Sequence, residues 1–562
     1  MSHPDPIDHG ADWPDITHPT HDVTNQPPPL AGANAYTGDQ ALVDALAREG
    51  GGWGDDRLRR FGAVCGEELL DIGFQANENP PKLRAFDRYG HRIDEVEFHP
   101  AYHRSMQLAR EHGLHSLTWT ADRDGAQVVR SALAYLHNQF ESGTMCPITM
   151  THAAVPALQH QPDVAEQWLP GILAPDYDPS CRPFEQKTGL TIGMGMTEKQ
   201  GGSDVRANTT RATPLGRPGP GREYKLVGHK WFFSAPMCDG FLVLAYSEGG
   251  LSCFLLPKWR PEGIRNAIHI QRLKDKLGDR SNASSEVEFR GAFGWMIGAE
   301  GRGVPTIIEM VGQTRLDCMV GSAGLMRQAT AQAIHHCAHR EAFGRPLIDQ
   351  PLMTNVLADL ALESEAALAL SLRLARAFGA AANGDETEKA FARLATPVGK
   401  YWICKRTPAQ VNEAQECLGG AGYVEETIMP RLFRQSPLNS IWEGSGNVQC
   451  LDVLRAMSRD AESVEAVIAE LRAARGQHPA FDAHLARLLA QLERPADLEP
   501  RARRFTEDLA LGLQASLLIR AGNEPVAQAF CAGRLGEQSY LAYGTLPDGL
   551  DQRAIVERAR PA

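Results

Sequence analysis

The sequence predicts an α+β protein of several domains, in which a β-domain lies along the chain between two mainly helical domains. Helical periodicity runs over about 40–190, short strand-like runs replace it near 190, and helical periodicity returns after about 300. At about 150 residues per domain, 562 residues correspond to three or four domains. The expected divisions are an extended or disordered arm (1–30), an N-terminal α-helical domain (31–190), a central β-domain (191–295), a C-terminal α-helical bundle (296–459) and a helical extension (460–562).

The N-terminal part begins with a segment that lacks periodicity and continues with amphipathic ones. Residues 1–30 hold seven prolines and four histidines, a composition typical of an extended or disordered arm. Apolar residues then recur three or four positions apart in ALVDALAREG, LRRFGAVCGEELLDIGF and GAQVVRSALAYLHNQFE. This spacing predicts helices that bury one face.

The middle of the chain changes character. The runs EYKLVGHKWFFSA, GFLVLAYSE and LSCFLLPKW are rich in Val, Phe, Tyr and Leu and are bounded by turn residues, which predicts strands. Long helices that pack on one another are expected around 304–341, 351–380 and 386–412. In the extension, VEAVIAELRAAR, FDAHLARLLAQLER and FTEDLALGLQASLLIR again have helical spacing.

Charge and cysteine content exclude several classes of protein. With 57 basic and 69 acidic residues the net charge is −12, which argues against non-specific coating of nucleic acid or anionic membrane. No apolar stretch reaches about 18 residues and the N-terminus lacks signal-peptide features, so we expect a soluble cytoplasmic protein. The eleven cysteines are scattered, which predicts reduced thiols rather than a disulfide framework. His335 and His339 lie four apart without an HExxH pattern, and we expect no metal site there.

Familiar nucleotide and hydrolase motifs are missing from the sequence. It contains no GxxxxGK[ST], no GxSxG and no complete GxGxxG between a strand and a helix, which argues against P-loop, α/β-hydrolase and Rossmann proteins. Three other glycine-rich segments remain, MGMTEKQGGS (194–203), LGGAGY (418–423) and IWEGSGN (441–447). Paired glycines let backbone amides approach a phosphate or a heterocycle closely, although each segment alone is more often a turn.

The order and spacing of these segments resemble the acyl-CoA dehydrogenase flavoprotein family. The resemblance lies in GMTEKQGGSDV, HKWFFSAP, KDKLGDRSNASSEVEF, REAFGRPL, ECLGGAGYVEE and NSIWEGSGNVQCLDVLR, and it is strong over about 190–455 and weaker over 35–190. The NQPPPL segment and the extension of about 100 residues resemble the branch linked to the bacterial response to DNA alkylation. The resemblance implies a β-domain flanked by two helical domains, FAD in the cleft between the β-domain and the second bundle, an acyl-CoA substrate and a homotetramer.

The resemblance also implies which residues bind FAD. Thr197 and Ser203 match positions that bond the flavin ring and a FAD phosphate, while Phe232 and Ser234 match an aromatic-x-hydroxyl element against the flavin. The full set of implied cofactor contacts is Met196, Thr197, Gly202, Ser203, Phe232, Phe233, Ser234, Trp442, Gly444, Ser445 and Asn447.

Glu443 matches the family's catalytic base, and Arg315 matches an arginine beside the flavin. The alternative base position of the family is Thr314 in this chain, and a threonine hydroxyl cannot take that role. Independently of the resemblance, Ser445 is a suitable N-cap for a helix beginning near Val448, whose free amides would face an anion.

Two positions depart from the family pattern. Glu416 stands where the family has Gln before LGGxGY, and Pro351 stands where a Gln is expected, with Gln350 one position early. Both positions contact the FAD of a neighbouring subunit in ordinary members. The sequence therefore leaves open whether a neighbouring subunit contacts FAD in this protein.

Two functions are compatible with these observations. The first is α,β-dehydrogenation of an acyl thioester with Glu443 as the base. The second is a DNA-binding protective flavoprotein with little turnover, in which double-stranded DNA would bind through the extension. Its candidate contacts are Arg501, Arg503 and Arg504, with Arg553, Arg558 and Arg560 near the end of the chain. The extension holds 12 Arg against 15 acidic residues, a net of −3, which is poor support for DNA binding.

Overall fold

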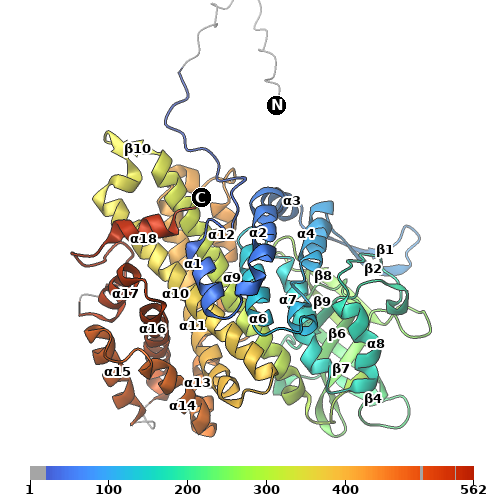
Figure 1. Ribbon diagram of the computed structural model, residues 1–562. Helices are drawn as coiled ribbons and strands as arrows, with labels where there is room; N and C mark the ends of the chain where they lie inside the picture. Colours follow the sequence, from blue (N-terminus) through green and yellow to red (C-terminus); the bar gives the residue numbers. More distant parts are fainter. Residues whose placement is uncertain (1–20, 494–497, 538–539, 562) are drawn as a thin grey trace, which may run out of the picture.

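The computed structural model describes residues 21–493, 498–537 and 540–561. Figure 1 shows the β-domain on one side of the molecule, the helices of the extension on the opposite side, and the long helices α9, α10 and α11 between them. The α+β architecture predicted from the sequence is confirmed. Of the expected arm, residues 1–20 lie outside the described part. In residues 21–30 no helix or strand forms, and Asn25 exchanges hydrogen bonds of 2.9 and 2.7 Å with the backbone of Glu341.

The N-terminal domain is a set of helices whose apolar faces share one core. Asp39 caps the first helix by accepting a hydrogen bond from the N–H of Leu42, and Leu42 and Leu46 are buried. The helices are α1 (Gln40–Arg48), α2 (Asp55–Val64), α3 (Leu70–Glu78), α4 (Pro100–Glu111), α5 (Leu117–Thr120), α6 (Ala126–Asn138), α7 (Met145–Leu158) and α8 (Pro162–Leu173).

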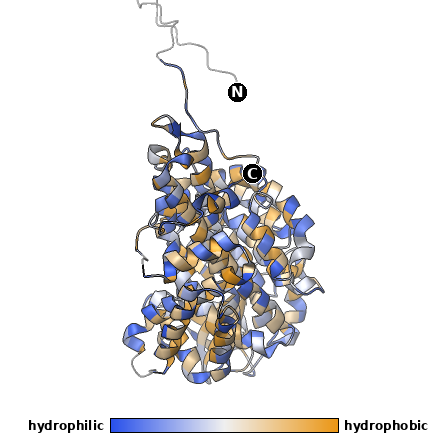
Figure 2. Ribbon diagram, turned by 60° about the vertical axis from the view of Figure 1, so that its left-hand side comes forward, coloured by the Kyte–Doolittle hydropathy of each residue, from blue (hydrophilic) through white to orange (hydrophobic). Residues whose placement is uncertain are grey.

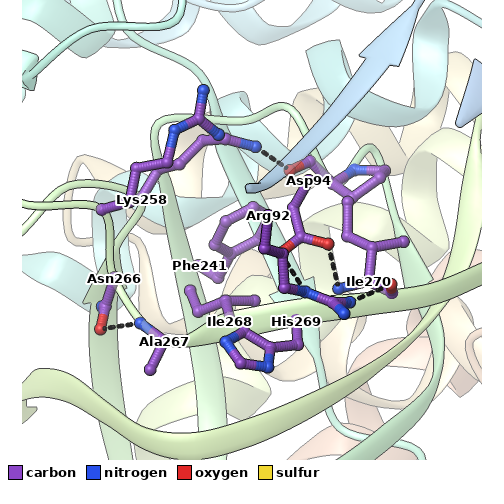
Figure 3. Close-up of a pocket in the computed structure, with 11 residues that line it drawn as sticks. Arg92, Asp94, Phe241, Lys258, Asn266, Ala267, Ile268, His269 and Ile270 are labelled. Carbon is purple, nitrogen blue, oxygen red and sulfur yellow. Dashed lines mark hydrogen bonds and ion pairs between the residues drawn. The ribbon is translucent and has the colours of Figure 1, made fainter. Parts of the chain in front are cut away.

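This domain also contains a β-hairpin that the sequence analysis did not predict. Strands β1 (Lys82–Phe86) and β2 (Arg92–Glu97) are rich in charged residues and lack the apolar alternation by which strands are recognised. Tertiary contacts hold them instead, because Asp94 accepts from the N–H of Ile270 at 3.1 Å and Arg92 donates to its carbonyl at 2.7 Å (Figure 3).

The β-domain is a seven-stranded sheet in which five strands close into a ring. The pairings run β6–β4–β5–β9–β7 and return to β6, with β3 beside β6 and β8 beside β9. The rings of Phe233, Phe241 and Phe289 fill its interior. The strands are β3 (Ile192–Gly195), β4 (Arg211–Pro214), β5 (Glu223–Ser234), β6 (Gly240–Ser247), β7 (Gly250–Pro257), β8 (Ile268–Leu273) and β9 (Ser284–Ile297).

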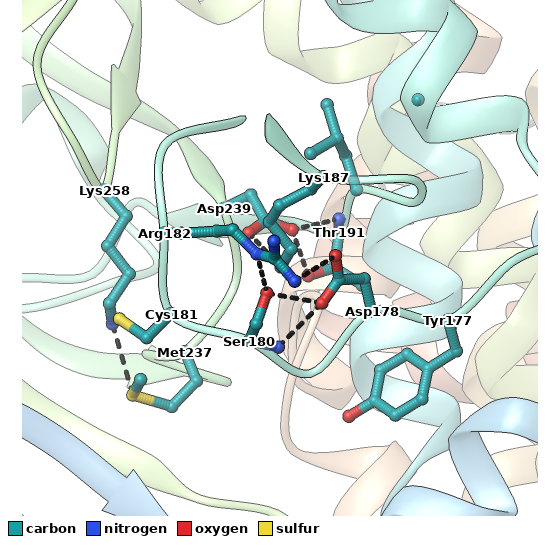
Figure 4. Close-up of polar contacts among 12 residues, drawn as sticks. Tyr177, Asp178, Ser180, Cys181, Arg182, Lys187, Thr191, Met237, Asp239 and Lys258 are labelled. Atoms are coloured by element: carbon teal, nitrogen blue, oxygen red, sulfur yellow. Dashed lines mark hydrogen bonds and ion pairs between the residues drawn. The ribbon is translucent and has the colours of Figure 1, made fainter. Parts of the chain in front are cut away.

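A buried aspartate fastens the N-terminal domain to this sheet. Asp239, at the start of β6, binds Lys187 at 2.6 Å and accepts from the N–H of Thr191 at 2.8 Å (Figure 4). Burial raises the pKa of Asp239, and Lys187 opposes that effect. The contact fixes where the connection from α8 enters β3, and therefore where the segment after β3 begins.

The C-terminal bundle is built on three long antiparallel helices, and the extension packs against it. The bundle comprises α9 (Gly303–His339), β10 (Glu341–Ala342), β11 (Arg345–Pro346), α10 (Pro351–Ala382), α11 (Glu386–Glu416), α12 (Met429–Gln435) and α13 (Gly446–Arg459). The extension comprises α14 (Ala461–Arg472), α15 (Pro479–Leu492), α16 (Ala502–Ala521), α17 (Glu524–Phe530) and α18 (Gln552–Ala559). Buried ion pairs join the two parts, since Arg534 contacts both Asp359 and Glu363 of α10.

Hydrophobic and hydrophilic residues alternate along the helices of the body, as the colours of Figure 2 show. Among the described helices, none combines the length and the apolar character that a membrane crossing requires. The eleven cysteines are all free, and ten of them are buried. The described residues contain no cluster of three or more His, Cys, Asp or Glu side chains arranged for a metal.

A polar layer joins α6, α7 and α9 in the interior. Arg130 and Asp317 form a buried bidentate ion pair, and Thr149 donates to the same carboxylate at 2.5 Å. Beside it, His115 and His152 are fully buried. Burial, together with the nearby guanidinium groups, lowers the pKa of His115 to about 2 and of His152 to about 3.

These two histidines make a testable prediction about acid stability. The folded state keeps both rings neutral, whereas the unfolded chain takes up protons below about pH 6.5, so stability falls as the pH drops through that value. At pH 5 each ring should cost about 2 kcal/mol relative to neutral pH. The double change of His115 and His152 to Asn should reduce the pH dependence of the thermal midpoint between pH 7.5 and 5.

Candidate active site

Glu443 lies in a short loop before α13, in a backbone conformation that side chains rarely adopt. Its φ is +56°, in the left-handed region, and the next residue, Gly444, has a φ of +98°. A non-glycine residue held in this way stores roughly 1–3 kcal/mol of strain and needs other contacts to hold it there. Glycine suits position 444 because a side chain is strained at this φ, and a Cβ atom there would also lie 2.5 Å from the side-chain nitrogen of Gln449.

Side chains from three helices hold this loop by its carbonyl groups. Lys400 of α11 donates to the carbonyls of Trp442 and Gly444 at 2.7 and 2.6 Å. Gln449 of α13 donates to those of Glu443 and Gly444, both at 2.9 Å. Arg315 of α9 donates to that of Glu443 at 3.1 Å. Together these bonds hold three successive peptide groups in position.

Arg315 and its partner aspartate anchor the loop to the bundle. The guanidinium of Arg315 binds Asp452 of α13 at 2.7 Å, and Arg393 of α11 binds the same carboxylate at 3.0 Å. Burial raises the pKa of Asp452, but the two arginines outweigh that effect, and its pKa lies below the ordinary value. The structure thus places Arg315 next to Glu443, in contact with its backbone carbonyl, and the position beside the flavin stays a prediction.

Thr314 meets the carboxylate of Glu443 directly. Its hydroxyl donates to Oε2 at 2.6 Å. Thr314 is buried in α9 and Glu443 is half-buried, so one carboxylate oxygen faces the helix and the other is free of hydrogen bonds from described protein groups. The sequence analysis considered Thr314 only as a residue that cannot be the base, and it missed this contact.

The segment after β3 carries Met196, Thr197, Gly202 and Ser203, and a buried carboxylate folds it into a loop. Glu198 accepts hydrogen bonds from backbone and hydroxyl groups of Thr209 and Thr210 and from Lys230, the last at 3.0 Å. Burial raises the pKa of Glu198, but Lys230 and these donors outweigh it and hold the pKa far below its ordinary value. This ion pair was also missed, and its only signal in the sequence is an isolated Lys in HKWFF.

The end of β5 presents Phe232 and Ser234 on the same side of the strand. Phe232 is 53% exposed, and the Lys274 ammonium lies 4.7 Å from its ring centre. The Ser234 hydroxyl lies 3.2 Å from that of Ser284, which in turn accepts from Lys276 at 3.0 Å. The prediction that Phe233 contacts the cofactor is wrong for its side chain. Alternate residues of a strand face opposite sides, and the ring of Phe233 is buried against Phe241 in the core.

The two halves of the predicted site meet through Trp442. This side chain packs against the core of the β-domain, as Met194 and Met196 do, while its ring N–H donates to Asn439 at 2.8 Å. The strand that precedes the Thr197 loop and the loop that carries Glu443 therefore flank the same interface between sheet and bundle.

Helix α13 begins at Gly446, two residues earlier than expected, with Ser445 at the N-cap as predicted. The Ser445 side chain makes no capping bond, so the first amides of the helix keep their hydrogen-bonding capacity. Arg503 of the extension reaches this point, donating to the side-chain oxygen of Asn447 at 2.8 Å. One of the arginines predicted to bind DNA thus contacts a residue predicted to bind the cofactor.

The other C-terminal arginines are mostly occupied by acidic partners. Arg558 binds Glu365 and Asp44 at 2.9 and 2.8 Å, and Arg553 binds Asp349. These side chains tie α18 to α1 and to the bundle rather than forming a free basic face. The contacts give no support to DNA binding at this end of the chain.

The two positions that depart from the family pattern lie at helix ends. Gln350 donates to the carbonyl of Ala342 in the preceding β10–β11 hairpin at 2.9 Å, and Pro351 opens α10. Glu416 ends α11, and it acts with burial to raise the pKa of Glu413. Whether a neighbouring subunit uses this region stays a prediction.

The arrangement suits a flavin nucleotide. In the described part of the chain, the hydroxyls of Thr197, Ser203 and Ser445 have no protein hydrogen-bond partner, and Phe232 offers an open aromatic face. Gly201, with a φ of +151°, has empty space where a side chain would stand. Unpaired hydroxyls, free helix amides and an exposed ring are groups that can hold a phosphate and a heterocycle.

A separate pocket of about 250 Å³ lies between the β1–β2 hairpin and β8, lined by residues that include Arg92, Lys258 and His269 (Figure 3). None of the predicted site residues lines it. Its charged groups are used internally, for example Lys258, which donates to the carbonyl of Pro236 at 2.6 Å. The pocket therefore belongs to the seam between hairpin and sheet.

Comparison with known proteins gives three adjoining family matches. Residues 25–179 match the adaptive response protein AidB N-terminal domain, 193–292 the acyl-CoA dehydrogenase middle domain, and 301–458 the acyl-CoA dehydrogenase C-terminal domain. AidB of Escherichia coli (strain K12) is 49% identical over 515 residues, covering 91% of this chain and 94% of that protein.

Two solved structures share the fold. The crystal structure of Caenorhabditis elegans ACDH-11 in complex with C11-CoA has a TM-score of 0.82 at 27% identity, covering 96% of this chain and 97% of that one. An acyl-CoA dehydrogenase from Bacillus anthracis complexed with FAD has a TM-score of 0.63 at 18% identity, covering 77% and 80%. The family matches place this chain among the FAD-dependent oxidoreductases that act on acyl-CoA. The chain belongs to the acyl-CoA dehydrogenase family, as its motifs predicted.

The loop geometry predicts that Lys400 is needed to hold Glu443 in place. Lys400→Met would leave the carbonyl of Trp442 without its partner and remove one of two donors from that of Gly444, at a cost of roughly 2–3 kcal/mol. We expect a lower thermal midpoint and a slower flavin reduction by substrate. Lys389→Met is the matched control on the same helix, because that side chain is 64% exposed. Equal thermal midpoints and reduction rates for the two variants would contradict this role.

Proposed function

We propose that the protein dehydrogenates an acyl thioester at its α,β-bond, with Glu443 as the base. The observation that supports this most is the Glu443 loop, in which side chains from three helices hold the strained backbone that carries the carboxylate. A carboxylate positioned in this way can take a proton from a bound substrate.

In the proposed reaction, the C–H bond at the α-carbon breaks and its proton passes to Glu443. The electron pair left behind forms the new double bond as the β-hydrogen departs as hydride. FAD, when bound, supplies the acceptor for that hydride. The products are the enoyl thioester, the protonated Glu443 and the reduced cofactor, so atoms and electrons balance.

The chain offers its own donor for the thioester carbonyl. The backbone N–H of Glu443 donates to no group among the described residues. We assign it to the carbonyl oxygen of the substrate, where a hydrogen bond makes the α-proton more acidic. Thr197, Ser203, Ser234, Ser445 and Asn447 are the residues we propose to hold FAD.

The proposal for Glu443 can be tested with a single change. Glu443→Gln keeps the size of the side chain but cannot accept the proton, so reduction of the flavin by a good acyl-CoA should fall by roughly a hundredfold or more. FAD content should stay near that of the native protein. Glu462→Gln, on the exposed side of α14, is the control. Reduction of Glu443→Gln at the native rate would exclude Glu443 as the base.

Three large apolar side chains of the bundle are strongly exposed. Phe343, at the tip of the β10–β11 hairpin, is 99% exposed, and Leu352 and Tyr423 are both 84% exposed. Single exposed apolar side chains are normal on monomeric proteins, so the homo-oligomer also stays a prediction from the family resemblance. The tetrameric state, the link to DNA alkylation and the binding of DNA stay predictions from the family resemblance.

Because Arg503 contacts Asn447, replacing it tests whether this arginine supports FAD binding rather than DNA binding. Arg503→Ala should weaken FAD binding by roughly fivefold, about 1 kcal/mol, because the oriented Asn447 amide is lost. Arg504→Ala, at the neighbouring exposed residue, should not change the FAD dissociation constant measured by fluorescence titration.

DNA binding is tested with a triple variant of the same cluster of arginines. If the extension binds duplex DNA, replacing Arg501, Arg503 and Arg504 together should weaken binding for all sequences. The salt dependence should also become shallower, by roughly 0.9 in slope for each phosphate that the protein no longer neutralises. Unchanged DNA affinity with weakened FAD binding would support the cofactor role of Arg503. The reverse result would contradict it.

A further inference from the structure

Thr314 has one hydroxyl proton and two acceptors within reach. Oε2 of Glu443 lies at 2.6 Å, and the carbonyl of Val311, one turn back in α9, lies at 3.1 Å. A threonine in a helix commonly donates to a carbonyl three or four residues earlier, so the second contact is an ordinary resting position. The first is the shorter, and it involves an ionisable group.

The charge of Glu443 decides which of the two acceptors the Thr314 hydroxyl binds. A bond to an ionised carboxylate is shorter and about twice as strong as a bond to a neutral oxygen. While Glu443 is ionised, the hydroxyl therefore points to Oε2. Once Glu443 carries a proton that advantage is lost, and the carbonyl of Val311 can satisfy the same hydroxyl without any movement of the helix.

No other described side chain donates to this carboxylate. Arg315 of α9 is directed at the carbonyl of Glu443 and at Asp452 of α13, and Lys400 of α11 is directed at the carbonyls of Trp442 and Gly444. These contacts hold the backbone of the loop. Only the Thr314 hydroxyl, among the described residues, sets the rotation of the carboxylate itself.

We propose that Thr314 is the positioning residue of the base. By holding Oε2 of the ionised Glu443, it presents Oε1 to the α-proton of the substrate. After proton transfer it turns to Val311 and releases the carboxylic acid, which can then pass its proton to solvent. This inference rests on the proposed function of Glu443 and adds the group that orients it.

The test compares hydroxyl-free and hydroxyl-bearing variants of the FAD-loaded protein. Thr314→Val keeps the shape of the side chain without the donor, and Thr314→Ser keeps the donor without the methyl group. Acetyl-CoA in D₂O is the probe, because it has α-hydrogens but no β-hydrogen to lose, so exchange at its α-carbon reports proton transfer alone. A longer acyl-CoA then reports the limiting rate of flavin reduction.

We expect Thr314→Val to slow both α-exchange and the limiting rate by roughly tenfold or more, with the dissociation constant of acyl-CoA unchanged. Thr314→Ser should stay within about threefold of the native rates. A native rate in Thr314→Val, or a loss in Thr314→Ser equal to that in Thr314→Val, would overturn the proposal. A loss that appears in substrate binding rather than in rate would also overturn it.

Two further variants distinguish a failure of the inference about Thr314 from a failure of the function proposed for Glu443. Thr314→Ala repeats the removal of the hydroxyl, and loss of FAD from both the Val and the Ala variants would assign Thr314 to the fold and overturn the inference. Glu443→Gln tests the proposed function separately. If exchange persists at the native rate in Glu443→Gln, the function proposed for Glu443 fails. If Glu443→Gln abolishes exchange while Thr314→Val leaves it unchanged, only the inference about Thr314 fails.

Discussion

The left-handed backbone at Glu443 is the constraint on which the arrangement of this site depends. A side chain in that conformation is unfavourable by roughly 1–3 kcal/mol, and the loop adopts it because donors on α9, α11 and α13 bind its carbonyl groups. Lys400 is buried and forms no ion pair among the described residues, so its charge is directed at these peptide oxygens. The three helices must be packed correctly before the carboxylate can occupy its place.

The β-domain is located relative to that loop by a second set of buried contacts. In the segment between β8 and β9, the hydroxyl of Ser281 donates to Glu141 of the N-terminal domain at 2.5 Å. Two residues earlier, the N–H of Asp279 donates to Gln435 of α12 at 2.6 Å. The same segment ends at Ser284, which contacts Ser234. One stretch of chain therefore ties both helical domains to the strand end proposed to bear the flavin.

The arginines of the extension mostly contact other residues of the protein. A cluster of arginines in the sequence is compatible with a phosphate-binding surface, but the cost of leaving a buried acid unpaired directs such side chains inward. Arg534 pairs with Asp359 and Glu363, and Arg558 pairs with Glu365. Arg503 contacts Asn447, which connects the extension to the cofactor side of the bundle. These contacts attach the extension to the bundle.

The sequence by itself determined the fold class, the long helices and the family, because these depend on local periodicity and on motifs whose spacing survives in the linear chain. It also placed Glu443, Arg315 and Ser445 in one neighbourhood, since they belong to motifs that the family resemblance covers. It could not show the β1–β2 hairpin, whose charged strands are held by Ile270, about 180 residues away. Nor could it show that Thr314 contacts Glu443, that Lys400 contacts the carbonyls on either side of it, or that Phe233 turns into the core. Those features were decided by the tertiary structure, because hydrogen bonds between distant helices and the side of a strand that a residue faces exist only once the domains have packed.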